Sequence, residues 1–237
     1  MLTFNTTKDG IIDYIKTNNL KVGDKLPPES ILTRELNVSR LTLRESLKLL
    51  KGEGLVYTIH GKGTYISSDV KHIRDTIDNN LGITEMIISA GFKPGVSYFE
   101  KDLEEADEEI AEKLNTEEGS DVLVFKRVRT ADDKPVVYSV DYFAPHLVHL
   151  FLNVKDKNIS IYNFLEEENN IIIDNSFAEL IPFLCDSDLA GKLNYVIGEP
   201  LMLIKQTISD NMGNPLIYGV EYLRTDCFKI FVNRRRK

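Results

Sequence analysis

The run GDKLPPESILTRELNVSRLTLRESLKLLKGEGLVYTIHGKGTYI, residues 23–66, decides the fold of the first part of this chain. Pro27 and Pro28 suit the first turn of a helix, where a missing backbone N–H costs nothing. Leu32 and Leu36 follow at i and i+4, the spacing of one buried helix face. The segment therefore predicts a short amphipathic helix.

A further helix is predicted directly after it. Ser39 is a suitable N-cap, and Leu43, Leu47 and Leu50 form an apolar stripe at helical spacing. The sequence GEG at 52–54 ends the pattern. Two helices joined by a short turn result.

The flanking segments complete this module. An upstream helical pattern runs around Ile11 and Ile15, and two short strands, LVYTI (55–59) and TYI (64–66), follow the last helix. Three helices and then a two-stranded ribbon are the order of a winged helix-turn-helix, whose third helix enters the major groove of DNA.

The connection HGKGT, residues 60–64, also resembles a loop that binds nucleotide phosphates. The P-loop needs Gly, four residues, Gly-Lys and then Ser or Thr. Val56 occupies the place of the first glycine, and Gly63 follows Lys62 where the hydroxyl belongs. The strict motif fails, so we predict a tight turn whose glycines supply positive φ.

Candidate DNA-contacting residues lie at the start of the third helix, off its leucine stripe, and at the tip of the ribbon. Arginines there can bind guanine N7 and O6 or clamp phosphates. The alternative is a solvated basic face on an ordinary helix. The candidates are Ser39, Arg40, Thr42, Arg44, His60, Gly61 and Lys62.

Composition and charge support two domains of different kinds. The chain has 237 residues, 42% hydrophobic and 28% charged, with a net charge of −8. Residues 1–74 carry 12 Lys and Arg against 8 Asp and Glu, whereas residues 75–237 carry 17 against 29. A basic module joined to an acidic one fits nucleic-acid binding by the first. Without an apolar run of eighteen residues or a signal peptide, we expect a cytoplasmic protein with no membrane partner.

The second module has the pattern of an α+β fold. Two β-rich runs with short connections, residues 121–143 and 201–223, predict antiparallel hairpins. Their similarity indicates two equivalent hairpins in one mainly antiparallel sheet with flanking helices, without a full internal repeat. We expect residues 1–68 to form the winged helix-turn-helix domain, 69–81 a linker and 82–237 the second domain.

The run 23–66 resembles the DNA-binding domain of the GntR family of bacterial transcription regulators. The resemblance implies DNA contacts by Arg40, Thr42 and Arg44 and by the wing tip at 60–61. Leu41 stands where many members carry Thr. Double-stranded operator DNA is therefore the expected partner.

The remainder resembles the UTRA effector domain of the HutC subgroup, a fold akin to chorismate lyase. The resemblance is carried by ITEMIISAG, RVRTADDKPV, SIYNFL, GEPL and GNPL. It implies a domain that binds a small metabolite and holds a homodimer together. We expect the dimer to bind a short palindrome as a repressor that the metabolite releases.

Two arginines of the second domain indicate the charge of the effector. Arg127 and Arg129 are two apart on a predicted strand and share a face, where burying both without an anion would be costly. This favours a phosphate or carboxylate ligand; the alternative is pairing with acidic residues on an exposed sheet face. Resemblance to sugar-phosphate-sensing members adds Ser139 and Ser160, and Glu221 can bond ligand hydroxyls.

Two other functions remain as alternatives. An enzyme of lyase-like fold is disfavoured, because no nucleophile triad or carboxylate pair stands out and His146 and His149 have no third metal ligand. Cys185 and Cys227 lack metal-ligand spacing, so reduced core thiols and no cofactor are expected. The other alternative is a DNA-binding protein whose large domain only dimerises.

Overall fold

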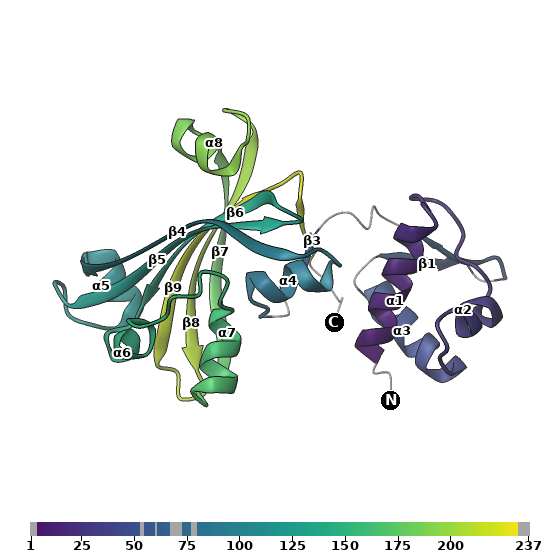
Figure 1. Cartoon of the computed structure of the whole chain (residues 1–237), viewed down its shortest axis with the longest axis horizontal. Coiled ribbons are helices and arrows are strands. Elements are labelled where there is room, and N and C mark those ends of the chain that lie inside the picture. Colours follow the sequence, from purple (N-terminus) through teal and green to yellow (C-terminus); the bar gives the residue numbers. More distant parts are fainter. Residues whose placement is uncertain (1–3, 53–54, 60, 67–72, 77–79, 232–237) are drawn as a thin grey trace, which may run out of the picture. The chain divides into compact units, whose positions relative to one another are not determined.

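The structure is a computed structural model of the chain (Figure 1). It describes residues 4–52, 55–59, 61–66, 73–76 and 80–231. The described residues form two compact units. The first takes the residues up to 76, Met86–Phe92 and residues 229–231; the second takes Asn80–Glu85 and Lys93–Phe228. Within these ranges, no helix is long and apolar enough to cross a lipid bilayer.

The first unit contains the three helices and the hairpin that the sequence predicts. They are α1 (Phe4–Thr17), α2 (Glu29–Glu35), α3 (Arg40–Gly52), β1 (Val56–Ile59) and β2 (Gly63–Ile66), seen in Figure 1. The helices share one core, in which Ile11, Ile15, Leu32, Leu43 and Leu50 are fully buried. The leucine spacing read from the sequence therefore marks the buried helix faces.

A small sheet pairs β3 (Ile73–Thr76) with β10 (Phe228–Phe231). Strand β3 falls within 69–81, which the sequence assigns to a linker. Four residues that pair with the far end of the chain leave no local pattern, so hydrophobic periodicity does not reveal this strand. Residues 67–72 and 77–79 lie outside the described ranges.

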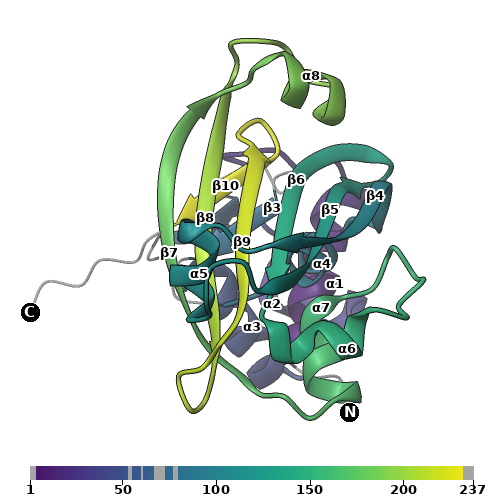
Figure 2. The same cartoon turned by 90° about the vertical axis from the view of Figure 1, so that its left-hand side faces the viewer.

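The second unit is built on a six-stranded antiparallel sheet, which Figure 2 shows with its strands side by side. The strand order is β4-β5-β6-β9-β8-β7. The strands are β4 (Pro94–Glu105), β5 (Asp121–Ala131), β6 (Lys134–Phe143), β7 (Ile173–Leu184), β8 (Pro200–Asp210) and β9 (Pro215–Arg224). The predicted α+β class, with a mainly antiparallel sheet, is confirmed.

The sheet consists of two similar halves. In chain order they are β4, α5 (Glu108–Leu114), β5, β6 and then β7, α8 (Ser187–Leu193), β8, β9. Asp107 and Asp186 cap the two helices by accepting backbone hydrogen bonds, and Asn115 and Asn194 end them in the left-handed conformation. The sequence predicts only equivalent hairpins, whereas the structure extends the equivalence to the preceding strand and helix.

Different elements cover the two faces of the sheet. Helices α5 and α8 pack on one face; α6 (Val148–Phe151) and α7 (Ile161–Asn163), with a 3-10 turn at Pro145–Leu147 and a π-helical turn at Phe164–Glu168, pack on the other. On β5, Val122 and Val124 face α5, while Leu123 and Phe125 face α6 and α7. The alternation continues along the strand and directs Arg127 and Arg129 to the α6 and α7 face.

Both cysteines are free and buried. Burial raises the pKa of the Cys185 thiol and of the Cys227 thiol, which keeps them protonated and unreactive. Cys185 packs in the cluster beneath α8. Both thiols therefore lie in the core, as the sequence predicts.

Candidate functional site

The first turn of α3 presents polar and basic side chains away from the core. Ser39 Oγ accepts a hydrogen bond from the backbone N of Thr42 at 3.1 Å and lies 2.8 Å from Thr42 Oγ1. Ser39 is thus the predicted N-cap. Arg40 and Arg44 are exposed, and their spacing of four residues puts them on the same side of the helix.

Arg44 is held by an acidic residue of the preceding helix. Its Nε lies 2.9 Å and 3.2 Å from the two carboxylate oxygens of Glu29, the first residue of α2. The Arg44 side chain remains 63% exposed. The ion pair therefore orients the guanidinium while leaving it accessible, a role for Glu29 that the sequence did not reveal.

The tip of the β1–β2 hairpin is a tight turn. Gly61 and Gly63 have φ of 74° and 123°, and Lys62 N donates to Ile59 O at 3.0 Å. The positive φ values confirm the predicted use of the glycines. Lys62 is exposed, and His60 lies outside the described residues.

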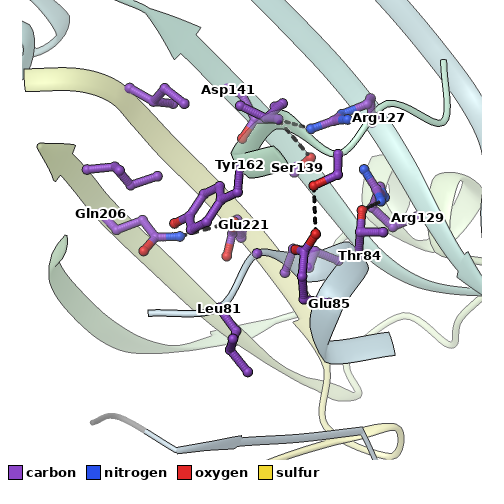
Figure 3. Close-up of a pocket in the computed structure, with 16 residues that line it drawn as sticks. Leu81, Thr84, Glu85, Arg127, Arg129, Ser139, Asp141, Tyr162, Gln206 and Glu221 are labelled. Atoms are coloured by element: carbon purple, nitrogen blue, oxygen red, sulfur yellow. Dashed lines mark hydrogen bonds and ion pairs between the residues drawn. The ribbon is translucent and has the colours of Figure 1, made fainter. Parts of the chain in front are cut away.

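A pocket that is partly open to solvent lies on the α6 and α7 face of the sheet (Figure 3); its empty space, with the solvent at its mouth included, is about 460 Å³. It is lined by all five residues that the sequence nominates for effector binding: Arg127, Arg129, Ser139, Ser160 and Glu221. Arg127 lies opposite Ser139, and Ser139 lies opposite Glu221, across three neighbouring strands. Ser160 reaches the pocket as the N-cap of α7.

Both arginines are buried, with only 4% and 3% of their surface exposed. Arg127 Nη2 donates to Asp141 Oδ2 at 2.9 Å, and its Nη1 donates to Ile159 O at 3.1 Å. Arg129 Nη2 donates to Thr84 Oγ1. The alternative of an exposed sheet face is wrong, although Arg127 does pair with an acid, Asp141.

Arg129 carries an electrostatic penalty. Burial, with a smaller contribution from the nearby Arg127 charge, lowers the pKa of Arg129 to about 9. Among the described residues, neither Arg127 Nε nor Arg129 Nε has a hydrogen-bond partner, although both atoms are buried. An unsatisfied buried donor costs roughly 1–3 kcal/mol. The pocket therefore favours a ligand that brings negative charge and acceptor atoms.

Further pocket residues come from the segment 81–85, which the sequence did not nominate for effector binding. Ser160 Oγ donates to Glu85 Oε1 at 2.7 Å, and Tyr162 OH donates to Asn80 Oδ1 at 3.0 Å. Glu85 Oε2 is buried without a donor among the described residues. These contacts join segments far apart in the chain, so no local spacing could predict them.

The opposite side of the pocket is formed by the amide of Gln206 and the carboxylate of Glu221. Gln206 Nε2 donates to Glu221 Oε1 at 3.1 Å, and Ser176 Oγ donates to Gln206 Oε1 at 2.7 Å. Gln206 and Glu221 occupy the places in the second hairpin that Arg127 and Asp141 occupy in the first. Figure 3 shows the arginines on one side and Gln206 with Glu221 on the other. The pocket thus has a cationic side and a side suited to hydroxyls.

Two family models match the chain over most of its length. The UTRA domain matches residues 89–229, and the bacterial regulatory proteins of the gntR family match residues 4–66. The chain belongs to the GntR family. Members of this family are DNA-binding transcriptional regulators, which decides against the enzyme alternative.

Relatives and solved structures agree with this GntR assignment. The transcriptional repressor NagR of Bacillus subtilis (strain 168) is 31% identical, over 90% of this chain and 86% of NagR. MngR of Escherichia coli (strain K12) is 26% identical, over 97% and 94%. The crystal structure of PhnF from Mycobacterium smegmatis shares the fold, with a TM-score of 0.64 at 21% identity over 97% and 99%. This GntR protein is a DNA-binding transcriptional regulator with an effector-binding UTRA domain.

The two pocket arginines should respond oppositely to replacement by methionine in the absence of ligand. Because the folded pKa of Arg129 lies below its ordinary value, the penalty for burying its charge is complete below about pH 9 and is relieved above it. Arg129→Met should therefore stabilise the protein at pH 7, by about 1–3 kcal/mol. Arg127→Met should destabilise it by roughly 3 kcal/mol, because the buried Asp141 loses its cationic partner and keeps only the hydrogen bond from Ser139 among the described residues. Urea unfolding at pH 7 measures both, and equal destabilisation by the two variants would contradict this electrostatic account.

Proposed function

We propose that this protein is a cytoplasmic, metabolite-responsive repressor whose pocket binds a small anionic effector such as a sugar phosphate. The observation that carries the proposal is the pair of buried guanidiniums, of which Arg127 contacts a carboxylate and Arg129 a hydroxyl. NagR and MngR are both named as repressors, which supports the same sign of regulation. MngR is named for mannosyl-D-glycerate, a sugar derivative that carries a carboxylate.

Three buried pocket atoms without a hydrogen-bond partner among the described residues indicate which groups the effector carries. Phosphoryl or carboxyl oxygens would accept hydrogen bonds from Arg127 Nε and Arg129 Nε. Glu85 Oε2 needs a donor, and a sugar hydroxyl supplies one. Ser139 and Glu221 would contact the remaining hydroxyls. A sugar phosphate carries both kinds of group in one small molecule.

The DNA-binding residues of the proposal are those of α3 and the wing. Ser39 and Thr42 would contact phosphates, Arg40 and Arg44 base edges or phosphates, and the wing tip at 60–62 the adjacent groove. Residues 1–68 would act as the DNA-binding domain, 69–81 as the linker and 82–237 as the effector domain. Effector binding would change the spacing of the two DNA-binding domains in a dimer and so release a palindromic operator.

A homodimer of the HutC type is part of the proposal, and strand β7 is its proposed contact. In the described sheet β7 is an edge strand whose only neighbour is β8. Phe177 is 74% exposed on it and Leu184 is 67% exposed. A long edge strand with exposed apolar side chains is a template for pairing with a second chain. A second copy would cover both.

The effector proposal predicts a selective thermal shift of the full chain. Sugar phosphates should raise the melting temperature where the same sugars without phosphate do not, and a ligand at 100 times its Kd stabilises by about 2.7 kcal/mol. Arg129→Met should fold and lose the shift, because it removes the guanidinium that forms no ion pair with a carboxylate among the described residues. If no phosphorylated or carboxylated compound stabilises the wild type, the dimerisation-only alternative is supported instead.

The DNA proposal predicts a specific loss in Arg44→Ala. Binding of operator DNA at fixed salt should weaken by roughly 1–3 kcal/mol, the usual cost of a bidentate base contact. Arg34→Ala is the matched control, because Arg34 is an exposed arginine of α2 whose removal changes the net charge equally. Fluorescence anisotropy measures both, and equal affinities of Arg44→Ala and wild type would exclude Arg44 from the interface.

The dimer proposal predicts that Phe177→Lys is monomeric. A charge at the centre of the proposed contact cannot be buried without a partner. Met212→Lys is the control, since Met212 is 83% exposed in the turn between β8 and β9. Light scattering after gel filtration gives the mass of each variant. A dimeric Phe177→Lys would place the contact elsewhere.

A further inference from the structure

Leu41 is the most exposed leucine of helix α3. It is 69% exposed, whereas Leu43 and Leu50 are fully buried and Leu49 is 41% exposed. A single exposed leucine is common on protein surfaces, so exposure alone assigns it no role. The position of Leu41 on the helix, however, indicates one. Leu41 lies in the first turn of α3, next to Arg40 and three residues before Arg44, so it shares the exposed face of these arginines.

The local structure orders the backbone that carries this side chain. Ser39 caps the helix through the backbone of Thr42, so the backbone around Leu41 is already helical without a ligand. Glu29 orients Arg44 beside it. An apolar side chain thus stands among groups suited to phosphates and guanine edges, and it can neither donate nor accept a hydrogen bond.

The major groove offers one apolar group to such a side chain, the 5-methyl group of thymine. We propose that Leu41 reads a thymine methyl in each operator half-site and that it is a specificity-determining residue of this regulator. This inference rests on the proposed function, because it requires α3 to enter the major groove. It adds a base identity that the arginines do not determine.

The expected change in DNA affinity follows from the area of the contact between Leu41 and the thymine methyl. Burying one methyl group is worth about 0.8 kcal/mol, so its removal should weaken binding by roughly three- to tenfold per half-site. Replacing thymine by deoxyuridine removes that methyl and leaves every hydrogen-bonding group of the base in place. The substitution therefore isolates the contact made by Leu41.

The test begins with operators selected from a randomised duplex pool by the full-length protein. Each thymine of the consensus is replaced in turn by deoxyuridine, and Kd is measured by anisotropy at fixed salt. The proteins are wild type, Leu41→Ala and the control Leu49→Ala, which removes an exposed leucine two turns further along the same helix. One thymine per half-site should show the three- to tenfold loss with wild type and Leu49→Ala, and no loss with Leu41→Ala.

Three outcomes would overturn the inference. A consensus without thymine, a scan in which every replacement is neutral, or a methyl effect that persists in Leu41→Ala each contradicts the role of Leu41 while leaving DNA binding intact. A pool that yields no consensus contradicts the proposed function itself, and the inference with it.

Discussion

Arg127 and Arg129 point from one strand into a region where almost none of their surface meets water. Two like charges so close together repel each other, and each also loses its hydration. Asp141 neutralises Arg127, whereas the hydrogen bond of Arg129 among the described residues goes to the hydroxyl of Thr84. Stability is supplied elsewhere, for example by the aromatic cluster in which Phe151 of α6 packs on Phe125 and Phe143 of the sheet. The pocket is therefore a polar region within an apolar sheet face. Burying the two arginines costs free energy of folding, and a bound ligand that neutralises their charge would offset this cost.

The pocket lies where the two similar halves of the sheet join. Strands β6 and β9 meet at the centre, where Ser139 of the first half lies opposite Glu221 of the second. Each half contributes one hydrogen-bonded pair from equivalent places: Arg127 with Asp141, and Gln206 with Glu221. The exchange of an arginine for a glutamine makes the two sides of the pocket unlike. A ligand with an anionic end and a hydroxyl-bearing end would therefore have a defined orientation.

Patterns within single elements were readable from the sequence, and contacts between distant elements were not. Helical leucine spacing located the winged helix-turn-helix, and strand alternation put Arg127 and Arg129 on one face of β5. The same alternation would have revealed Asp141, two residues after Ser139 on β6. Thr84 and Glu85 carry no local signal, because they reach the pocket only through the packing of a segment from far upstream. The sequence did not predict strand β3 for a similar reason, because its partner strand β10 lies at the other end of the chain.

The central claim is that an anionic group of the effector binds Arg127 Nε and Arg129 Nε, which have no hydrogen-bond partner among the described residues. A crystal structure of the full-length protein with a sugar phosphate that raises its melting temperature tests this most directly. The account predicts phosphoryl oxygens within hydrogen-bond distance of Arg127 Nε and Arg129 Nε, with a sugar hydroxyl donating to Glu85. A phosphate bound elsewhere, with both Nε atoms still unpartnered or bonded only to protein carboxylates, would contradict it.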